Sequence, residues 1–223
     1  MNNWHLILAS QSPRRRELLS LVGIPFEVTS SDVKEIPRAH ETPVELVKRL
    51  SRAKALDAQL NGQEHGLVIA CDTIVAVDNR SAMTDVLGKP QDAGEAMSML
   101  RDLRGRSHVV YSAVTLRHPG RKMATDLVSS YVTMRRYEEA EMEAYVATGD
   151  PLDKAGGYAI QHEGFDPVEA IEGCYASVMG LPLCHVASRL RHWGVDVPRD
   201  VPAACQAHTG HACRFYREII TSQ

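Results

Sequence analysis

The chain has 223 residues, of which 44% are hydrophobic and 24% charged, and its formal net charge is -3. This length allows a sizeable core in one or two domains, and the acidic balance argues against a general nucleic-acid binder. No apolar run is long enough to cross a bilayer, and the first residues do not resemble a signal peptide. The five cysteines, an odd number, do not indicate a disulfide framework. We therefore expect a cytoplasmic protein with no membrane contact and no stable nucleic-acid partner.

The first predicted elements are a strand at residues 5–9 and a helix that begins after Ser12. The Ser12 hydroxyl can cap this helix, and Pro13 suits its first position. Arginines occupy residues 14–16, where the helix dipole disfavours cations. An anion held by free backbone N–H groups, the guanidinium groups and the Ser10 hydroxyl would explain them. The pattern favours a phosphate site, and the alternative is a solvated basic turn.

A second strand is predicted at residues 25–29, followed by a polar loop and a helix. Thr42 and Glu45 form a capping-box pattern that starts this helix. Lys54 falls on the face that Val47 and Leu50 define, where an apolar residue is expected. Most such lysines extend to solvent, but beside a phosphate site this one is a plausible ligand.

Residues 68–77 form an apolar, β-branched run that predicts a strand in the middle of a covered sheet. Asp72 stands at its centre. An unpaired carboxylate buried there would cost several kcal/mol or take up a proton. The surroundings must therefore supply a cleft, a cation or a metal, unless Asp72 only caps a neighbouring loop.

The remaining chain mixes strands and helices and predicts an α/β mixed sheet. Lys89 stands in a short loop between Gly88 and Pro90. Paired glycines at 156–157 suit close approach of the backbone to a ligand, or a simple turn. The other predicted elements are helices at 92–103, 138–148 and 183–193, and strands at 108–116, 126–137 and 168–171, with a hairpin loop at 117–120.

Five motifs in this order resemble the Maf family of nucleoside triphosphate pyrophosphatases, over residues 6–197. They are Leu8-Ala9-Ser10-Gln11-Ser12-Pro13-Arg14-Arg15, Ala70-Cys71-Asp72-Thr73, Gly88-Lys89-Pro90, Asp153-Lys154-Ala155-Gly156-Gly157-Tyr158 and Gly180-Leu181-Pro182. The resemblance implies a two-lobed α/β fold around a long mixed β-sheet with flanking helices, and an active-site cleft between the lobes. It also implies hydrolysis of a nucleoside triphosphate to the monophosphate and pyrophosphate, and a possible homodimer.

The same resemblance implies roles for single residues. Asp72 is expected to activate water, and Ser10, Arg14 and Arg15 to bind phosphates. Lys54 and Lys89 are expected to line the site. A divalent cation, Mg²⁺ or Mn²⁺, is expected beside Glu35 and Asp72. Whether Asp72 is a general base, a metal ligand or both stays open at this point.

The resemblance is strongest to the branch acting on dTTP and UTP, because Asp72-Thr73 and Ile160-Gln161 match that branch. Arg15, Thr73 and Gln161 are expected to set specificity, since a glutamine amide offers a donor and an acceptor to a pyrimidine edge. Phe165 stands in a segment that departs from the family pattern. We expect it to narrow or stack in the base pocket, which would extend the substrates to modified pyrimidines and suggests a house-cleaning role on non-standard nucleotides.

Residues 198–223 lie beyond the resemblance, so we expect a domain at 1–197 and a separate tail. Cys205, His208, His211 and Cys213 stand close together in this tail. They suggest a zinc site, although the spacing is tighter than in a usual finger loop. The alternative is a disordered tail. A rival function is a regulatory or nucleic-acid-associated protein, linked to cell division, that uses the arginines at 14–16 to bind rather than to catalyse.

Overall fold

The computed structural model describes residues 5–60, 66–78, 84–118 and 123–221. A seven-stranded sheet forms its centre, in the order β2-β1-β3-β5-β6-β7, with β4 also paired to β3. The strands are β1 (Leu6–Ala9), β2 (Phe26–Thr29), β3 (Leu67–Asp78), β4 (Thr84–Leu87), β5 (Ser107–Arg117), β6 (Ala124–Met134) and β7 (Val168–Glu172).

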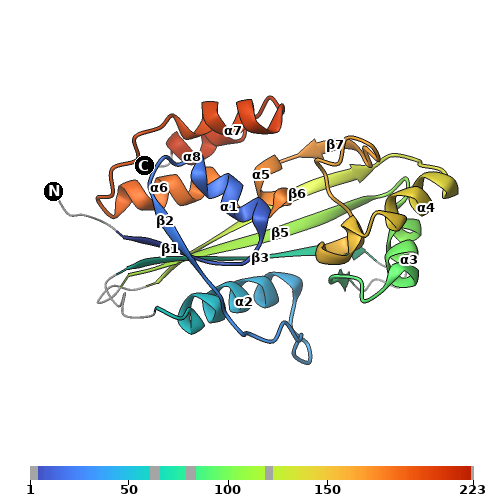
Figure 1. The fold of residues 1–223 in the computed structure, drawn as a ribbon, viewed down its shortest axis with the longest axis horizontal. Coiled ribbons are helices and arrows are strands. Elements are labelled where there is room, and N and C mark those ends of the chain that lie inside the picture. Colours follow the sequence, from blue (N-terminus) through green and yellow to red (C-terminus); the bar gives the residue numbers. More distant parts are fainter. Residues whose placement is uncertain (1–4, 61–65, 79–83, 119–122, 222–223) are drawn as a thin grey trace.

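The sheet is mixed. Strand β1 pairs in parallel with β2 and β3, and the other pairs are antiparallel. The long strands β3, β5 and β6 run through the length of the molecule (Figure 1). This architecture confirms the predicted fold class, a mixed α/β sheet flanked by helices.

Helices cover both faces of the sheet. Figure 1 shows α2 below the sheet, α1 and α5 to α8 above it, and α3 and α4 at one end. The helices are α1 (Pro13–Ser20), α2 (Pro43–Asp57), α3 (Ala93–Leu103), α4 (Glu139–Ala147), α5 (Tyr175–Met179), α6 (Leu183–His192), α7 (Val201–Thr209) and α8 (Tyr216–Thr221), with 3-10 turns η1 (Asp150–Asp153) and η2 (Ala155–Gly157). None of the helices in the described ranges is long and apolar enough to span a bilayer.

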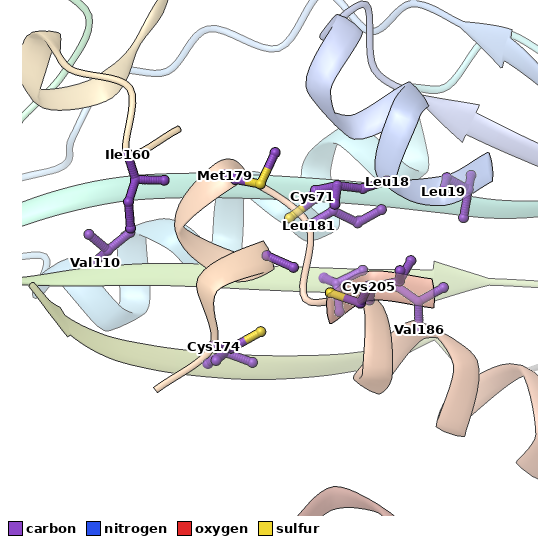
Figure 2. Packing of buried hydrophobic residues seen from close by; sticks show 14 of the residues in the cluster. Leu18, Leu19, Cys71, Val110, Ile160, Cys174, Met179, Leu181, Val186 and Cys205 are labelled. Atoms are coloured by element: carbon purple, nitrogen blue, oxygen red, sulfur yellow. The ribbon is translucent and has the colours of Figure 1, made fainter. Parts of the chain in front are cut away.

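Alternation along β3 directs its side chains to the two faces of the sheet, with one large cluster on one face and two smaller clusters on the other. Cys71 and Val75 pack in the large cluster under α1, α5 and α6, whereas Ala70 and Ile74 pack on the α2 side. Figure 2 shows the large cluster, in which Cys71 lies close to Leu18 of α1 and to Leu181. Because successive strand residues point to opposite faces, Asp72 faces α2 and its neighbour Thr73 faces the other layer.

One edge of β3 has a gap in its pairing. The register of β1 with β3 ends at the Leu8–Ile69 pair, and that of β4 with β3 begins at the Val75–Leu87 pair. Among the described strands, none pairs with residues 71–74 on this side. Strand β1 runs parallel to β3 and β4 runs antiparallel, so both end at the gap. Ser10 and Lys89, which follow these two strands, are therefore brought to its opposite sides.

The predicted helix starts are confirmed. The hydroxyl of Ser12 caps α1, Thr42 and Glu45 form the capping box of α2, and Asp92 caps α3. The predicted strand at 126–137 ends earlier, at Met134. The chain leaves the sheet there because Tyr137 is buried and donates a hydrogen bond to the carbonyl of Leu100, 2.7 Å away.

Before the tail, one strand and one α-helix were not predicted, β4 and α5. Strand β4 has four residues and α5 has five, too few for a hydrophobic period to be visible. The hairpin loop predicted at 117–120 lies partly outside the described residues, although β5 and β6 do pair antiparallel as predicted.

The tail folds onto the rest of the molecule. Asp200 caps α7, and Val201 and Cys205 are buried in the large cluster. The ring of His211 stacks on Tyr175 of α5, with centroids 5.1 Å apart. Disorder is therefore the wrong expectation for α7, because its apolar face packs against the core. The boundary at residue 197 stays a prediction.

Candidate active site

A buried lysine and two carboxylates lie on the α2 side of the gap. The Lys54 ammonium is 2.5 Å from Asp72 Oδ1 and 2.5 Å from Glu35 Oε1. Lys54 is only 8% exposed and Asp72 only 3% exposed. Lys54 therefore does not extend to solvent. It turns from the apolar face of α2 towards the carboxylate in the centre of β3, which is the cation that the sequence required.

The two carboxylates have different proton affinities. Burial raises the pKa of Asp72, although Lys54 and Arg15 counteract part of this effect. Burial acts in the same direction on Glu35, but there Lys54, Lys89 and Arg15 outweigh it, so the pKa of Glu35 is lowered. The two pKa values thus shift in opposite directions, and the raised pKa of Asp72 suits a group that takes a proton from water.

Arg15 connects the two sides of the gap. Its guanidinium donates to the carbonyl of Gly180 at 2.8 Å, to Ser10 Oγ at 3.4 Å and to Thr73 Oγ1 at 3.3 Å. Thr73 in turn shares a hydrogen bond of 2.8 Å with Ser112 of β5. The phosphate-site candidates Ser10 and Arg15 and the specificity candidate Thr73 therefore form one hydrogen-bonded group.

A pocket opens beside this group on the α1 and α5 side of the sheet, with about 670 Å³ of empty space including its mouth. A concave site that joins an apolar lining to a few polar groups is the usual form of a small-molecule pocket. One part is cationic, with Arg14, Arg15 and Lys89, and the other is mostly apolar. The apolar part is lined by Val75, Val110, Tyr158, Ala159, Ile160, Val178 and Met179.

Gln161 also lines the pocket. Its Oε1 atom is buried and has no hydrogen-bond partner among the described residues. A buried acceptor without a donor costs free energy, so this atom is ready to receive an N–H group from a ligand. The role of Gln161 in specificity stays a prediction.

The glycines at 156 and 157 bring the chain close to β3. Gly156 has a φ of 73°, and a Cβ atom built there would lie 3.0 Å from Val75 Cγ2. Its backbone N–H donates to the carbonyl of Gly88 at 2.9 Å, next to Lys89. The glycines thus form the turn η2, which packs closely against β3, and close approach to a ligand stays a prediction.

The carboxylates of Glu35 and Asp72 fit a divalent cation of the expected kind. Mg²⁺ is usually held by one or two carboxylates together with substrate phosphates. The two carboxylates lie close together, because both contact the Lys54 ammonium. In the described parts of the chain, no three His, Cys, Asp or Glu side chains form a group that could hold a metal ion. The proposed zinc site in the tail therefore gains no support.

Phe165 does not narrow the base pocket, contrary to expectation. It is 3% exposed and stacks on Tyr145, with ring centroids 4.4 Å apart and an interplanar angle of 14°. It is not among the residues that line the pocket. The expectation rested on its place in a segment that departs from the family pattern, and local pattern does not reveal that Phe165 is buried against α4.

Sequence reasoning also missed residues of the site. Ser112 orients Thr73, and the Gly180 carbonyl holds Arg15. Asp153 accepts from Arg14 Nη1 at 3.2 and 3.4 Å. A serine on a strand and a backbone carbonyl leave no signal in the sequence, whereas the motif that contains Asp153 was noted without a role.

Solved structures with a related arrangement are distant. A dITP/XTP pyrophosphatase from Mycobacterium abscessus is 15% identical, with a TM-score of 0.39 over 85% of this chain and 94% of that one. A Ham1 protein from Staphylococcus aureus is 14% identical, with a TM-score of 0.39 over 74% of this chain and 79% of that one.

Curated relatives are much closer in sequence. A dTTP/UTP pyrophosphatase from Caldanaerobacter subterraneus subsp. tengcongensis is 43% identical, over 85% of this chain and 90% of the relative. Proteins described in the same words from Pelotomaculum thermopropionicum and Bacillus cereus are each 41% identical over 86% of this chain, and cover 98% and 97% of their own lengths. The Maf-like protein family profile matches residues 5–193, which include every residue of the candidate site. This chain belongs to the Maf-like protein family.

Proposed function

We propose that this protein is a pyrophosphatase, a hydrolase of acid anhydrides, that converts dTTP and UTP to the monophosphate and pyrophosphate. The observation that carries the proposal is a pocket whose lining combines cationic side chains with Gln161, whose buried amide oxygen has no hydrogen-bond partner among the described residues. The curated relatives, dTTP/UTP pyrophosphatases at 41% to 43% identity, support the same substrates.

The cationic part suits the triphosphate. Arg15, Ser10 and the N-terminal N–H groups of α1 offer donors to phosphate oxygens, and Arg14 and Lys89 add positive charge. Hydrolysis of a phosphoanhydride depends mainly on positioning and charge neutralisation. Asp72 takes the proton of the attacking water. Burial raises the pKa of this carboxyl group, and the Lys54 ammonium limits the rise by favouring the ionised carboxylate.

The apolar part suits a pyrimidine. Uracil and thymine carry an N–H donor between two carbonyl groups, so this N–H can donate to Gln161 Oε1 while the Gln161 amide N–H₂ donates to a carbonyl. Cytosine has an acceptor at the same ring position and would leave the buried oxygen unsatisfied. Thr73 and Arg15, which are hydrogen-bonded to each other at the sheet, are the other two residues that we expect to set base specificity.

Glu35 and Asp72 would hold a Mg²⁺ or Mn²⁺ ion, which would neutralise charge on the phosphate oxygens. A cytoplasmic location and a homodimer are further parts of the proposal. Light scattering during size-exclusion chromatography checks the dimer.

The test is the release of pyrophosphate and of orthophosphate from a panel of triphosphates with Mg²⁺. We expect pyrophosphate from UTP and dTTP, weak activity on CTP and purine nucleotides, and loss of activity in Asp72→Asn. Modified pyrimidine triphosphates in the panel examine the house-cleaning role. Orthophosphate as the product would point to a phosphatase instead.

Gln161→Glu tests the base contact within the same panel. It removes the amide donor and adds a charge, so we expect kcat/KM for UTP to fall by roughly tenfold or more. Gln59→Glu, an exposed position at the end of α2, is the matched control. Unchanged selectivity in Gln161→Glu would remove the assignment.

The rival function is nucleotide or nucleic-acid binding without hydrolysis, through the arginines at 14–16. Arg14 and Arg15 both line the pocket, and Arg14 is paired with Asp153. If wild type and Asp72→Asn are equally inert on every triphosphate, the binding role replaces the enzyme.

A further inference from the structure

Lys154 is a buried cation that the proposed reaction does not use. It is 6% exposed, yet its ammonium is fully engaged. Nζ donates to the Asp150 carbonyl at 2.6 Å, to Asp150 Oδ1 at 2.7 Å and to Asp153 Oδ1 at 2.7 Å. An ammonium has three N–H donors. All three are therefore used inside the protein, and none is left to bind a phosphate, although Lys154 lies at the pocket.

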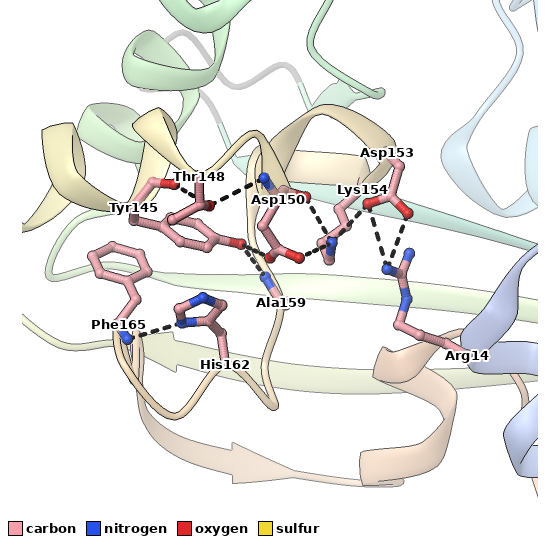
Figure 3. Close-up of polar contacts among 9 residues, drawn as sticks. All are labelled: Arg14, Tyr145, Thr148, Asp150, Asp153, Lys154, Ala159, His162 and Phe165. Carbon is pink, nitrogen blue, oxygen red and sulfur yellow. Dashed lines mark hydrogen bonds and ion pairs between the residues drawn. The ribbon is translucent and has the colours of Figure 1, made fainter.

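One branch of this network leads to the phosphate end of the pocket. The Asp153 carboxylate, which Lys154 holds, accepts from Arg14 Nη1 at 3.2 and 3.4 Å (Figure 3). Arg14 stands in the first turn of α1, far from Asp153 in the sequence, and its guanidinium lines the pocket. Asp153 thereby determines where the Arg14 side chain rests.

The other branch leads to the base end. Asp150 Oδ2 accepts from the Tyr145 hydroxyl at 2.7 Å, and the same hydroxyl accepts the N–H of Ala159 at 3.0 Å. Figure 3 shows this chain of contacts from Lys154 to Ala159. Ala159 lies two residues before Gln161, and the Tyr145 ring that holds it is wedged between Phe165 and His162.

The network is charged at neutral pH. Burial alone would raise the pKa of Asp150 and of Asp153, but hydrogen bonds from Lys154 and the further contacts of each carboxylate outweigh it, and both pKa values are lowered. Without the Lys154 ammonium, the half-buried Asp150 carboxylate would keep only the Tyr145 hydroxyl among these partners, and the exposed Asp153 carboxylate would keep only Arg14. Such an arrangement holds its members in one geometry.

We propose that Lys154 is a positioning residue that couples the two ends of the nucleotide pocket. Through Asp153 it sets Arg14 beside the phosphates, and through Asp150 and Tyr145 it holds the backbone that carries Gln161 at the base. The inference rests on the proposed function for the identity of the two ends. It assigns a role to residues of the Asp153-Lys154 motif without placing them in contact with substrate.

The experiment measures binding at each end separately, by calorimetry on the full chain. The dissociation constant of inorganic tripolyphosphate reports the phosphate end. The ratio of the dissociation constants of CMP and UMP reports the base end, because the phosphate contacts cancel in the ratio. Neither readout requires catalysis, so an inactive wild type would refute the proposed function without affecting this test.

Lys154→Met keeps the length of the side chain and removes the charge. We expect it to weaken tripolyphosphate binding and to lower the CMP/UMP ratio, each by roughly tenfold, the order of one hydrogen bond to a charged group. Lys154→Arg should recover part of both. Lys48→Met, on α2 and outside the pocket lining, is the matched control and should change neither.

Variants of Asp153 and Tyr145 test the two branches of the network one at a time. Asp153→Asn should weaken tripolyphosphate binding and leave the CMP/UMP ratio unchanged, and Tyr145→Phe should do the opposite. These two variants also decide the matter if Lys154→Met does not fold. The proposal is overturned if Lys154→Met lowers thermal stability while both readouts stay at wild-type values, or if the Asp153 and Tyr145 variants affect both ends equally.

Discussion

Asp72 and Thr73 are neighbours in the sequence and serve different halves of the site. On a strand they must point to opposite faces, Asp72 to Lys54 and Glu35, Thr73 to Arg15 and the base pocket. A sheet with complete pairing would keep these two groups apart. The gap beside residues 71–74 leaves this edge of β3 without a paired strand. Asp72 is not among the residues that line the pocket, so the proposed reaction requires a bound triphosphate to extend past this edge to the carboxylate on the other face.

Lys54→Met tests whether the ammonium sets the proton affinity of Asp72. Burial raises the pKa of Asp72, and the Lys54 ammonium makes the largest opposing contribution. In Lys54→Met this contribution is lost, so the pKa of Asp72 should rise further. The base must be ionised to accept a proton, and the acid limb of the kcat/KM profile for UTP should therefore move to higher pH. A profile measured from pH 5 to 9 checks this.

Lys48→Met, which changes a lysine on the same helix, is the control for Lys54→Met. An unchanged acid limb in Lys54→Met, with only a higher KM, would mean that Lys54 binds phosphate and does not tune Asp72.

At the scale of elements, the η2 turn places the loop of residues 153–161 against β3. Gly156 has a positive φ, and a Cβ atom built there would lie 3.0 Å from Val75, which also lines the pocket. Gly149 has a similar φ of 76°, but a Cβ atom there would meet nothing within 4 Å. Substitution of Gly149 would therefore introduce backbone strain alone, whereas substitution of Gly156 would add a steric clash with Val75.

Gly149→Ala should lower the free energy of unfolding by about 1 kcal/mol, the cost of a left-handed conformation for alanine. Gly156→Ala should cost about 1–3 kcal/mol more, because its Cβ also overpacks Val75, and it should raise the KM for UTP. Urea unfolding and steady-state kinetics of both variants measure this difference. Equal losses in the two variants would show that the contact with Val75 is unimportant.

At the scale of the whole molecule, strands of unequal length determine the site. The long strands β3 and β5 form a continuous platform, and the short strands β1 and β4 leave part of β3 unpaired between them. Helices α1 and α5 then place Arg15 and Gly180 over this opening. The tail supports the same layer, because α7 packs in the large core and His211 stacks on α5.

His108 makes the stability of the whole fold depend on pH. It is 3% exposed on β5, shares a 2.7 Å hydrogen bond with Tyr158, and burial lowers its pKa to about 4 from the ordinary value of 6.5. The unfolded chain therefore binds a proton that the folded protein does not between these values. Stability should fall by up to about 3 kcal/mol as the pH drops from 6.5 to 4.

His108→Gln should remove this part of the pH dependence. Urea unfolding at pH 7.5 and 5.0 compares it with the wild type, and His192→Gln, at an exposed position, is the control. Equal pH dependence in wild type and His108→Gln would exclude His108 as its source.

The sequence by itself determined the order of the longer elements up to α6, the helix caps, the mixed α/β class and the motif residues from Ser10 to Gln161. These follow from local rules, namely period, capping and glycine placement, and from the family resemblance. Only the tertiary structure decided that Asp72 meets Lys54, that Phe165 packs away from the pocket, and that the tail folds against α5. Those outcomes depend on register and on packing between segments distant in the chain, and short-range pattern carries no information about either. The gap in the sheet is the clearest case, because it exists only once three strands are paired.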